Sequence, residues 1–345
     1  MKKIDIICND GSPLGVTEAS IFGEDGRVGL GGSELFLLTL CRAWHDAGHQ
    51  VRLYNSPTHP NASAFQQLPI DAFVPSEDRD VVIVFRSPNH RLTPTTKGLK
   101  VWLSCDQMTV GDFKTLARQV DKIVTISPNH AQYFEKTYNI ENTITIDIPV
   151  RDWDYDIEVE KVPYRCIYNS MPDRGIEQLH NVWAQIVKEI PEASLVITSD
   201  WRLWNPQMGD NAIKRYRQIY AQLPNVMYRG AINRRALIRQ EMMAQVHLYP
   251  STYDELFCIS VAETQVAGAY PITSSSGALK TTNMGTIIPG VATSPEFNKK
   301  FVKTAIEMLR NQEELAEKAK ALQIKAKERF GLNRILEEWD EVFDG

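Results

Sequence analysis

The sequence has no long apolar run. Its longest uninterrupted apolar stretches, such as 81–85, have about five residues, whereas a membrane-spanning helix needs ~20 and a secretory leader needs ~7 or more after a basic start. This shortage argues against both kinds of segment. We therefore expect a cytoplasmic protein, and peripheral contact with a membrane surface stays open.

The sequence is also short of paired cysteines and of metal-binding histidine motifs. Its five cysteines include no C-x-x-C pair, and its seven histidines include no H-E-x-x-H motif. Disulfide frameworks are typical of small chains dense in cysteine, and zinc sites need ligands at close, regular spacing. The sequence predicts neither, and we expect no metal and no other cofactor.

Neither sign of charge dominates the chain. Lys and Arg number 38 against 43 Asp and Glu, a formal charge of −5, and 43% of the residues are apolar. This composition is typical of a globular chain, and the lack of a dense basic stripe argues against a nucleic-acid partner. The 345 residues exceed the ~150 of an average domain, so we expect two domains.

Short runs rich in branched residues alternate with longer segments of helical period, which indicates βα units and a mostly parallel sheet. The expected strands are 4–8, 51–54, 81–85, 101–103, 123–126 and 144–148, then 165–169, 195–198, 226–228, 246–249 and 270–273. The expected helices are 33–47, 174–189, 211–222, 234–244 and 260–267, with further helix beyond 295. Ser33 is the expected cap of the first of these helices.

The alternation stops once, over a polar, acidic stretch between Pro149 and Pro163, and then restarts. The expected organisation is an N-terminal α/β domain over 1–150, a linker over 151–163 and a C-terminal α/β domain over 164–330. The last segment, 331–345, carries Ile335, Trp339 and Val342 on one helical face, which is too apolar to be left in water. Packing of this helix back on the N-terminal domain is one option.

The most specific feature is the segment 250–263, which follows an expected strand and opens an expected helix. Glu255 and Glu263 are eight residues apart, so on a continuous helix they lie ~12 Å apart and within ~80° of one side. The helix start between them has free N–H groups that suit a phosphate. Sugar hydroxyls, diphosphate and ribose hydroxyls follow one another in the same order in a nucleotide sugar, and carboxylates accept hydrogen bonds from diols. The simpler alternative is that Glu255 caps the helix and Glu263 is solvated.

Several motifs together resemble GT-B glycosyltransferases of family 4. The family's E-x7-E signature is similar to Glu255-Leu-Phe-Cys-Ile-Ser-Val-Ala-Glu263, and its G-x-P-V-I run and glycine loop resemble the segment from Gly268 to Gly277. The segment 168–175, which contains Asp173-Arg174-Gly175, resembles the S-x-D-R-G form of the commoner R-x4-K-G motif. The G-G-x-E turn of the family is similar to Gly31-Gly32-Ser33-Glu34.

The resemblance implies two Rossmann-like domains facing a cleft and a retaining, metal-independent glycosyl transfer. The implied partners are a nucleoside diphosphate sugar as donor and a hydroxyl group of a glycan, a lipid or another molecule as acceptor. Glu263 would bind the ribose diol, Glu255 the donor sugar and Arg174 the diphosphate. Further implied donor-binding residues are Gly31, Gly32, Ile232, Phe257, Cys258, Ile259, Ser260 and Gly277. Asn169 departs from the family pattern, because relatives keep a second basic residue there.

Two aspartate positions outside these motifs need separate interpretation. Asp106 follows an expected strand at its carboxyl end, where parallel sheets bind ligands, so it is a candidate to bind or deprotonate an acceptor hydroxyl; a capping role is an equal alternative. The Asp78-Arg79-Asp80 run has the spacing of a metal-binding D-x-D motif. It precedes a strand instead of following one, and we interpret it as a solvated turn.

Two other functions stay open. One is a non-catalytic subunit that binds sugar nucleotides. The other is a different enzyme on the GT-B scaffold, such as an epimerase or a glycosyltransferase acting on DNA bases, although the balanced charge argues against DNA.

Overall fold

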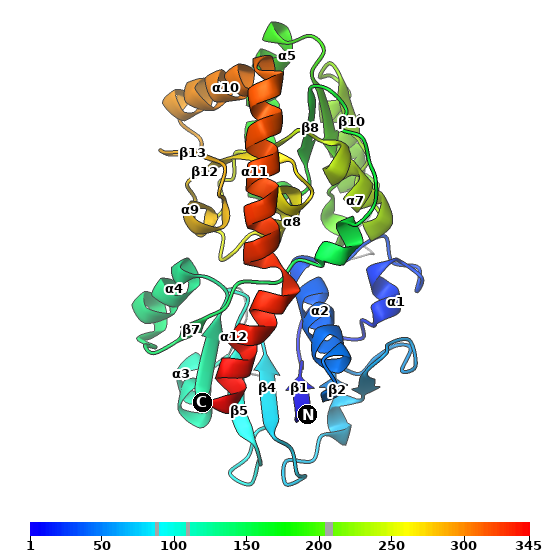
Figure 1. The fold of residues 1–345 in the computed structure, drawn as a ribbon, viewed down its shortest axis with the longest axis vertical. Coiled ribbons are helices and arrows are strands. Elements are labelled where there is room, and N and C mark those ends of the chain that lie inside the picture. Colours follow the sequence, from blue (N-terminus) through cyan, green and yellow to red (C-terminus); the bar gives the residue numbers. More distant parts are fainter. Residues whose placement is uncertain (87–89, 108–110, 204–209) are drawn as a thin grey trace. The chain divides into compact units, whose positions relative to one another are not determined.

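The computed structural model consists of two α/β units, each built around a parallel sheet (Figure 1). It describes residues 1–86, 90–107, 111–203 and 210–345, with the backbone alone over 210–213. One unit contains Met1–Gly26, Leu30–Pro149 and Leu332–Gly345, and the other contains Arg27–Gly29 and Val150–Gly331. The predicted α/β class with two doubly wound, Rossmann-like sheets is confirmed.

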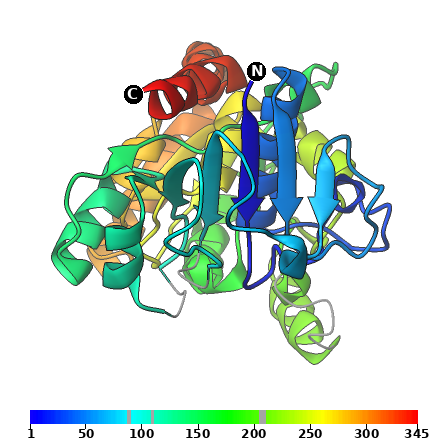
Figure 2. The same cartoon turned by 90° about the horizontal axis from the view of Figure 1, so that it is seen from below.

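The sheet of the first unit has the strand order β3-β2-β1-β4-β5-β6-β7, and all its neighbouring strands pair in parallel; the blue arrows in Figure 2 run in one direction. Its strands are β1 Lys3–Ile7, β2 Gln50–Tyr54, β3 Gln66–Leu68, β4 Val81–Phe85, β5 Leu99–Leu103, β6 Lys122–Thr125 and β7 Ile144–Thr145. Its helices are α1 Glu18–Ile21, α2 Gly32–Asp46, the 3-10 turn η1 Ile70–Ala72, α3 Phe113–Gln119, α4 Pro128–Tyr138 and α12 Leu332–Asp344.

Helix α2 buries the apolar stripe that its sequence period predicts. Leu37, Leu40, Cys41 and Trp44 are all buried. Its N-cap is Gly31 and not Ser33, so the predicted cap is wrong by two positions. The C-terminal helix α12 packs on α2, with the Trp44 and Trp339 rings edge to face at 5.2 Å between centroids.

The sheet of the second unit has the order β10-β9-β8-β11-β12-β13, again with parallel neighbours. Its strands are β8 Arg165–Tyr168, β9 Ser194–Ile197, β10 Val226–Tyr228, β11 Val246–Tyr249, β12 Tyr270–Ser274 and β13 Thr286–Ile288. Its helices are α5 Ile176–Glu189, α6 Asp210–Tyr220, α7 Arg234–Met243, α8 Ile259–Val266, α9 Leu279–Thr282, α10 Pro295–Arg310 and α11 Gln312–Phe330. Its 3-10 turns are η2 Asp152–Tyr155, η3 Pro172–Arg174 and η4 Trp201–Leu203.

The strand order of each sheet reverses direction once. In the second sheet the reversal lies between the paired strands β8 and β11, because the chain first adds strands on one side of β8 and then on the other. Loops that leave the carboxyl ends of two such strands diverge to opposite faces and leave room for a ligand between them. This switch point is therefore where a ligand site of the second unit is expected.

Candidate functional site

Arg174 and Glu255 lie on the two loops that leave this switch point. Arg174 ends the turn η3, which follows β8, and Glu255 belongs to the loop after β11. Gly175 lets the two loops touch: its φ is +120°, and a Cβ there would lie 2.4 Å from the carbonyl oxygen of Pro250. Since no other residue tolerates both conditions, the glycine after Arg174 is required by packing.

Arg174 and Glu255 form a partly buried ion pair. Arg174 Nη1 donates to Glu255 Oε2 at 3.1 Å, and the Arg174 guanidinium carbon lies 3.3 Å from the centre of the Tyr253 ring. Its buried Nε has no hydrogen-bond partner among the described residues, although it lies 3.4 Å from an Asp173 carboxylate oxygen. The guanidinium therefore keeps donor capacity beyond its contact with Glu255.

The carboxyl of Glu255 is held at both oxygens. Tyr249 Oη donates to Oε1 while Arg174 holds Oε2, and the side chain is buried. Burial raises the pKa of Glu255, and the charge of Arg174 and the hydrogen bond from Tyr249 offset part of that rise. Gly277 packs against the backbone of the same residue, because its φ is +54° and a Cβ there would lie 2.3 Å from the Glu255 carbonyl oxygen. The glycine loop thus fixes the Glu255 backbone.

Glu255 does not lie on the helix that carries Glu263. Helix α8 begins at Ile259, and its N-cap is Cys258 with φ +77°, so the segment from 255 to 258 is a loop. The helical separation of ~12 Å derived from the sequence therefore does not apply. The alternative in which Glu255 caps this helix is not observed either, since the cap is Cys258.

Glu263 is buried in an ion-pair chain, so the alternative of a solvated residue is wrong. Arg234 Nη1 donates to Glu263 Oε1 at 2.8 Å, and Arg234 Nε donates to Asp154 Oδ2 at 2.8 Å. The side chains of all three are less than one-tenth exposed. No sequence motif identified Arg234 or Asp154, which are 80 positions apart.

Asn169, the position at which the resemblance implied a basic residue, contacts another buried acid. Its Nδ2 donates to Glu241 Oε1 at 2.6 Å, and Tyr155 Oη donates to Glu241 Oε2 at 2.7 Å. Burial and the nearby charge of Glu263 raise the pKa of Glu241. The amide of Asn169 therefore has its own hydrogen-bond partner in the carboxyl of Glu241.

The residues at the start of α8 have structural side chains. Phe257 is buried, with its ring 5.8 Å from that of Phe330, and Cys258 is also buried. Ile259 and Ser260 open the helix, and their N–H groups have no acceptor within it by helix geometry. Phe257 and Ile259 have apolar side chains and Cys258 is buried, so any contact of these three residues with a phosphate would be made by backbone.

The loop that contains Ile232 is held by a residue that sequence reasoning did not assign. Asp200, at the carboxyl end of β9, accepts from Ala231 N at 2.8 Å and from the Arg202 guanidinium at 2.6 Å. Gly230 has φ +68°, and a Cβ there would lie 2.5 Å from Asp200 Oδ2. Asp200 thus sets the path of the loop.

The candidate residues of the first unit are Gly31, Gly32 and Asp106, and each has a defined structural position. Gly31 is the N-cap of α2 and Gly32 its first residue, and a Cβ at Gly31 would lie 2.7 Å from Glu34 Oε2. Asp106 forms an ion pair with Arg86, whose φ is +71°. The cap of the next helix, α3, is Asp112, so Asp106 does not cap it.

The Asp78-Arg79-Asp80 run is only partly the solvated turn that we expected. Asp78 is exposed and pairs with Lys97, but Arg79 is buried and donates to the buried Asp5 at 2.6 Å. Asp5 also binds Arg52 of the neighbouring strand. Arg79 therefore forms a buried ion pair with β1 from the position just before β4.

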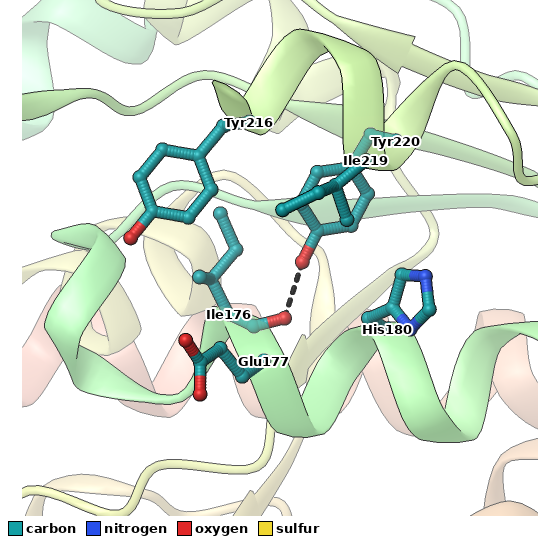
Figure 3. Close-up of a pocket in the computed structure, with 6 residues that line it drawn as sticks. All are labelled: Ile176, Glu177, His180, Tyr216, Ile219 and Tyr220. Atoms are coloured by element: carbon teal, nitrogen blue, oxygen red, sulfur yellow. Dashed lines mark hydrogen bonds between the residues drawn. The ribbon is translucent and has the colours of Figure 1, made fainter. Parts of the chain in front are cut away.

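A pocket of about 190 Å³ lies between α5 and α6 (Figure 3). It is lined by Ile176, Glu177, His180, Tyr216, Ile219 and Tyr220. Tyr220 Oη donates to the carbonyl oxygen of Ile176 across it. The pocket shares no residue with the site predicted from the sequence, and it is smaller than the ~300–1,000 Å³ of ordinary ligand pockets.

Within 1–86, 90–107, 111–203 and 210–345, no group of three or more His, Cys, Asp and Glu residues is arranged to hold a metal ion. In the same part of the chain, no helix combines the length and the apolar character needed to cross a membrane.

No protein-family model and no curated protein matches this sequence significantly, but solved structures match it in fold. HepE from Anabaena, solved in complex with UDP, has a TM-score of 0.70 and 15% identity, over 99% of each chain. AviGT4, a glycosyltransferase involved in avilamycin A biosynthesis, has a TM-score of 0.68 and 16% identity, over 99% of this chain and 97% of its own. TarM has a TM-score of 0.58 and 14% identity over 76% of this chain, which spans only 55% of the length of TarM.

These likenesses establish the fold. Together with the two parallel sheets, they show that the chain has the GT-B fold of glycosyltransferases, as the sequence motifs predicted.

Proposed function

We propose that this protein is a retaining glycosyltransferase that binds a nucleoside diphosphate sugar in its second unit and transfers the sugar to a hydroxyl acceptor. The observation that carries the proposal is the ion pair of Arg174 and Glu255 at the β8–β11 switch point, followed along the chain by Glu263 on α8. HepE, solved in complex with UDP-glucose and with UDP, supports this type of donor.

Each residue of this group has a distinct role in the proposal. Glu263 accepts hydrogen bonds from the ribose diol, and Glu255 accepts them from hydroxyls of the donor sugar. The N–H groups of 257–260 and the Arg174 guanidinium bind the diphosphate. Gly31, Gly32, Ile232 and Gly277 are further proposed donor-binding residues, and Asp106 is proposed to contact the acceptor hydroxyl.

The chemical step follows from the charge that forms on the leaving group. The bond from the anomeric carbon to the phosphate oxygen breaks while the acceptor oxygen bonds to the same carbon from the same face. The acceptor proton passes to the departing phosphate oxygen. Arg174 and the first amides of α8 stabilise the negative charge that develops there, more in the transition state than in the ground state.

A thermal-shift screen against nucleoside diphosphates and their sugars tests the proposal directly. A ligand present at 100 times its Kd adds ~2.7 kcal/mol to the free energy of unfolding, which is easily measured. At least one sugar nucleotide is expected to stabilise the protein and to be turned over. Stabilisation without turnover would identify a sugar-nucleotide-binding subunit instead, and no stabilisation by any member of the panel would contradict the proposal.

Transfer is expected not to depend on a divalent cation, because Arg174 and the α8 amides can neutralise the leaving diphosphate. Dialysis against EDTA should leave the initial rate within about twofold, as expected when no cation takes part in the rate-limiting step. The measurement is the initial rate with saturating donor before and after chelation. Loss of activity that added Mg²⁺ or Mn²⁺ restores would contradict this expectation.

A further inference from the structure

Tyr249 joins the two loops of the candidate donor site. It is the last residue of β11 and is fully buried. Its Oη donates to Glu255 Oε1 and lies 3.0 Å from the Oγ of Ser170, which belongs to the loop after β8. Because the Tyr249 proton is used by Glu255, the Ser170 hydroxyl donates to Tyr249. One phenol thus links both loops that leave the switch point.

This link leaves Glu255 with a defined orientation. Tyr249 holds Oε1 and Arg174 holds Oε2, so the plane of the carboxylate is fixed from two sides. Each carboxylate oxygen has two acceptor positions, so one contact to an oxygen does not by itself prevent a second donor from binding there. A buried carboxylate of this kind accepts hydrogen bonds well only while it is ionised.

We infer that Tyr249 is a positioning residue that keeps Glu255 ionised and oriented to accept hydrogen bonds from the hydroxyls of the donor sugar. The inference rests on the proposed function for its ligand and on the geometry above for its mechanism. In this inference Tyr249 affects recognition of the donor sugar and not recognition of the nucleoside diphosphate.

The charges around Glu255 determine the sign of the expected pH effect. Arg174 and Tyr249 favour the ionised carboxylate, while burial and the charge of Asp173 oppose it. Further titratable groups around Tyr249 are Cys258, Tyr168 and His247, whose ring stacks on that of Tyr249 at 5.5 Å between centroids. Removing the Tyr249 hydroxyl removes one hydrogen bond to the charged form, so the pKa of Glu255 rises further. Activity that needs ionised Glu255 is then lost at a higher pH than in the wild type.

The test is Tyr249→Phe, which deletes a single oxygen from the core. The matched control is Tyr220→Phe, because Tyr220 is also a buried tyrosine of the second unit but donates only to a backbone carbonyl. In Tyr249→Phe, kcat/KM with UDP-glucose is expected to fall about tenfold, and its acidic limb to move up by about 1–2 pH units. The Kd for UDP should stay within about twofold, since in the proposal Glu255 binds only the sugar. Tyr220→Phe should resemble the wild type in all three measurements.

A titration of the ligand-free protein separates this inference from the proposed function. Glutamate labelled with ¹³C at the side-chain carboxyl, assigned with Glu255→Gln, reports the pKa of Glu255 by NMR. A higher pKa in Tyr249→Phe and not in Tyr220→Phe supports the positioning role, even if the wild type binds no sugar nucleotide and the proposed function fails. An unchanged pKa, or an unchanged pH profile of kcat/KM in an active enzyme, overturns the inference.

Discussion

Replacing Arg174 with alanine is expected to lower kcat of sugar transfer by about 10- to 100-fold. Diphosphate departure builds negative charge that the guanidinium stabilises more in the transition state than in the ground state. Charge-assisted hydrogen bonds of this kind contribute ~1.5–3 kcal/mol, and ~1.4 kcal/mol corresponds to a factor of ten in rate. The measurement is steady-state kinetics of the purified variant, with its thermal stability recorded in parallel.

Two further variants make this result specific. Arg174→Lys keeps the charge but loses the planar fork, so it should recover part of the rate. Arg310→Ala removes another arginine of the same unit that pairs with Glu189 at the surface, and it should change neither rate nor stability noticeably. If Arg174→Ala retains more than about half of the wild-type kcat/KM, then Arg174 does not stabilise the leaving group.

The main elements of the fold could be predicted because their signals are local. Runs such as Val81–Phe85 are buried on both faces of a parallel sheet and therefore appear as continuous apolar segments. The missed strands, Gln66–Leu68 and Thr286–Ile288, lie at sheet edges, are three residues long and contain polar residues. The strand expected over 144–148 is only Ile144–Thr145. It lies at the edge of the sheet and pairs with β6 alone, and β6 ends at Thr125. Short edge strands depend on their neighbours more than on their own sequence.

The candidate site could be predicted only where its residues are close in sequence. The E-x7-E run and the Asp-Arg-Gly turn are local, and the structure brings Arg174 and Glu255 together. The residues that contact these glutamates come from other segments. Tyr249, which holds Glu255, is the last residue of β11. Arg234, which holds Glu263, lies in α7, and its partner Asp154 lies in a turn of the expected linker. A tyrosine in an apolar strand, or an arginine at the start of a helix, has an ordinary structural explanation at the level of sequence. Only the three-dimensional contacts distinguish these residues from others of their kind.

Replacing each of the two glutamates of the site is expected to impair a different property, ligand affinity for Glu263 and turnover for Glu255. Glu263→Ala should weaken binding of UDP and of UDP-glucose equally, by about 10- to 100-fold, because the ribose diol is common to both ligands. Glu255→Ala should lower turnover while the Kd for UDP stays within about twofold, since in the proposal only this carboxylate reaches the sugar. Isothermal titration calorimetry with both ligands on both variants measures the difference.

The surroundings of Glu263 decide which substitution gives a clean result. In Glu263→Ala, Arg234 keeps its ion pair with Asp154, so no buried charge is left alone. Removing Arg234 instead would leave the buried Glu263 without its ion-pair partner beside the buried Glu241, while Asp154 would keep its pair with Arg151. Leaving a buried charge unpaired in this way costs ~3–5 kcal/mol of stability. A loss of UDP affinity in Glu263→Ala at unchanged thermal stability therefore reports binding and not unfolding. Equal losses of UDP affinity in the Glu263 and Glu255 variants would contradict the proposed division of roles.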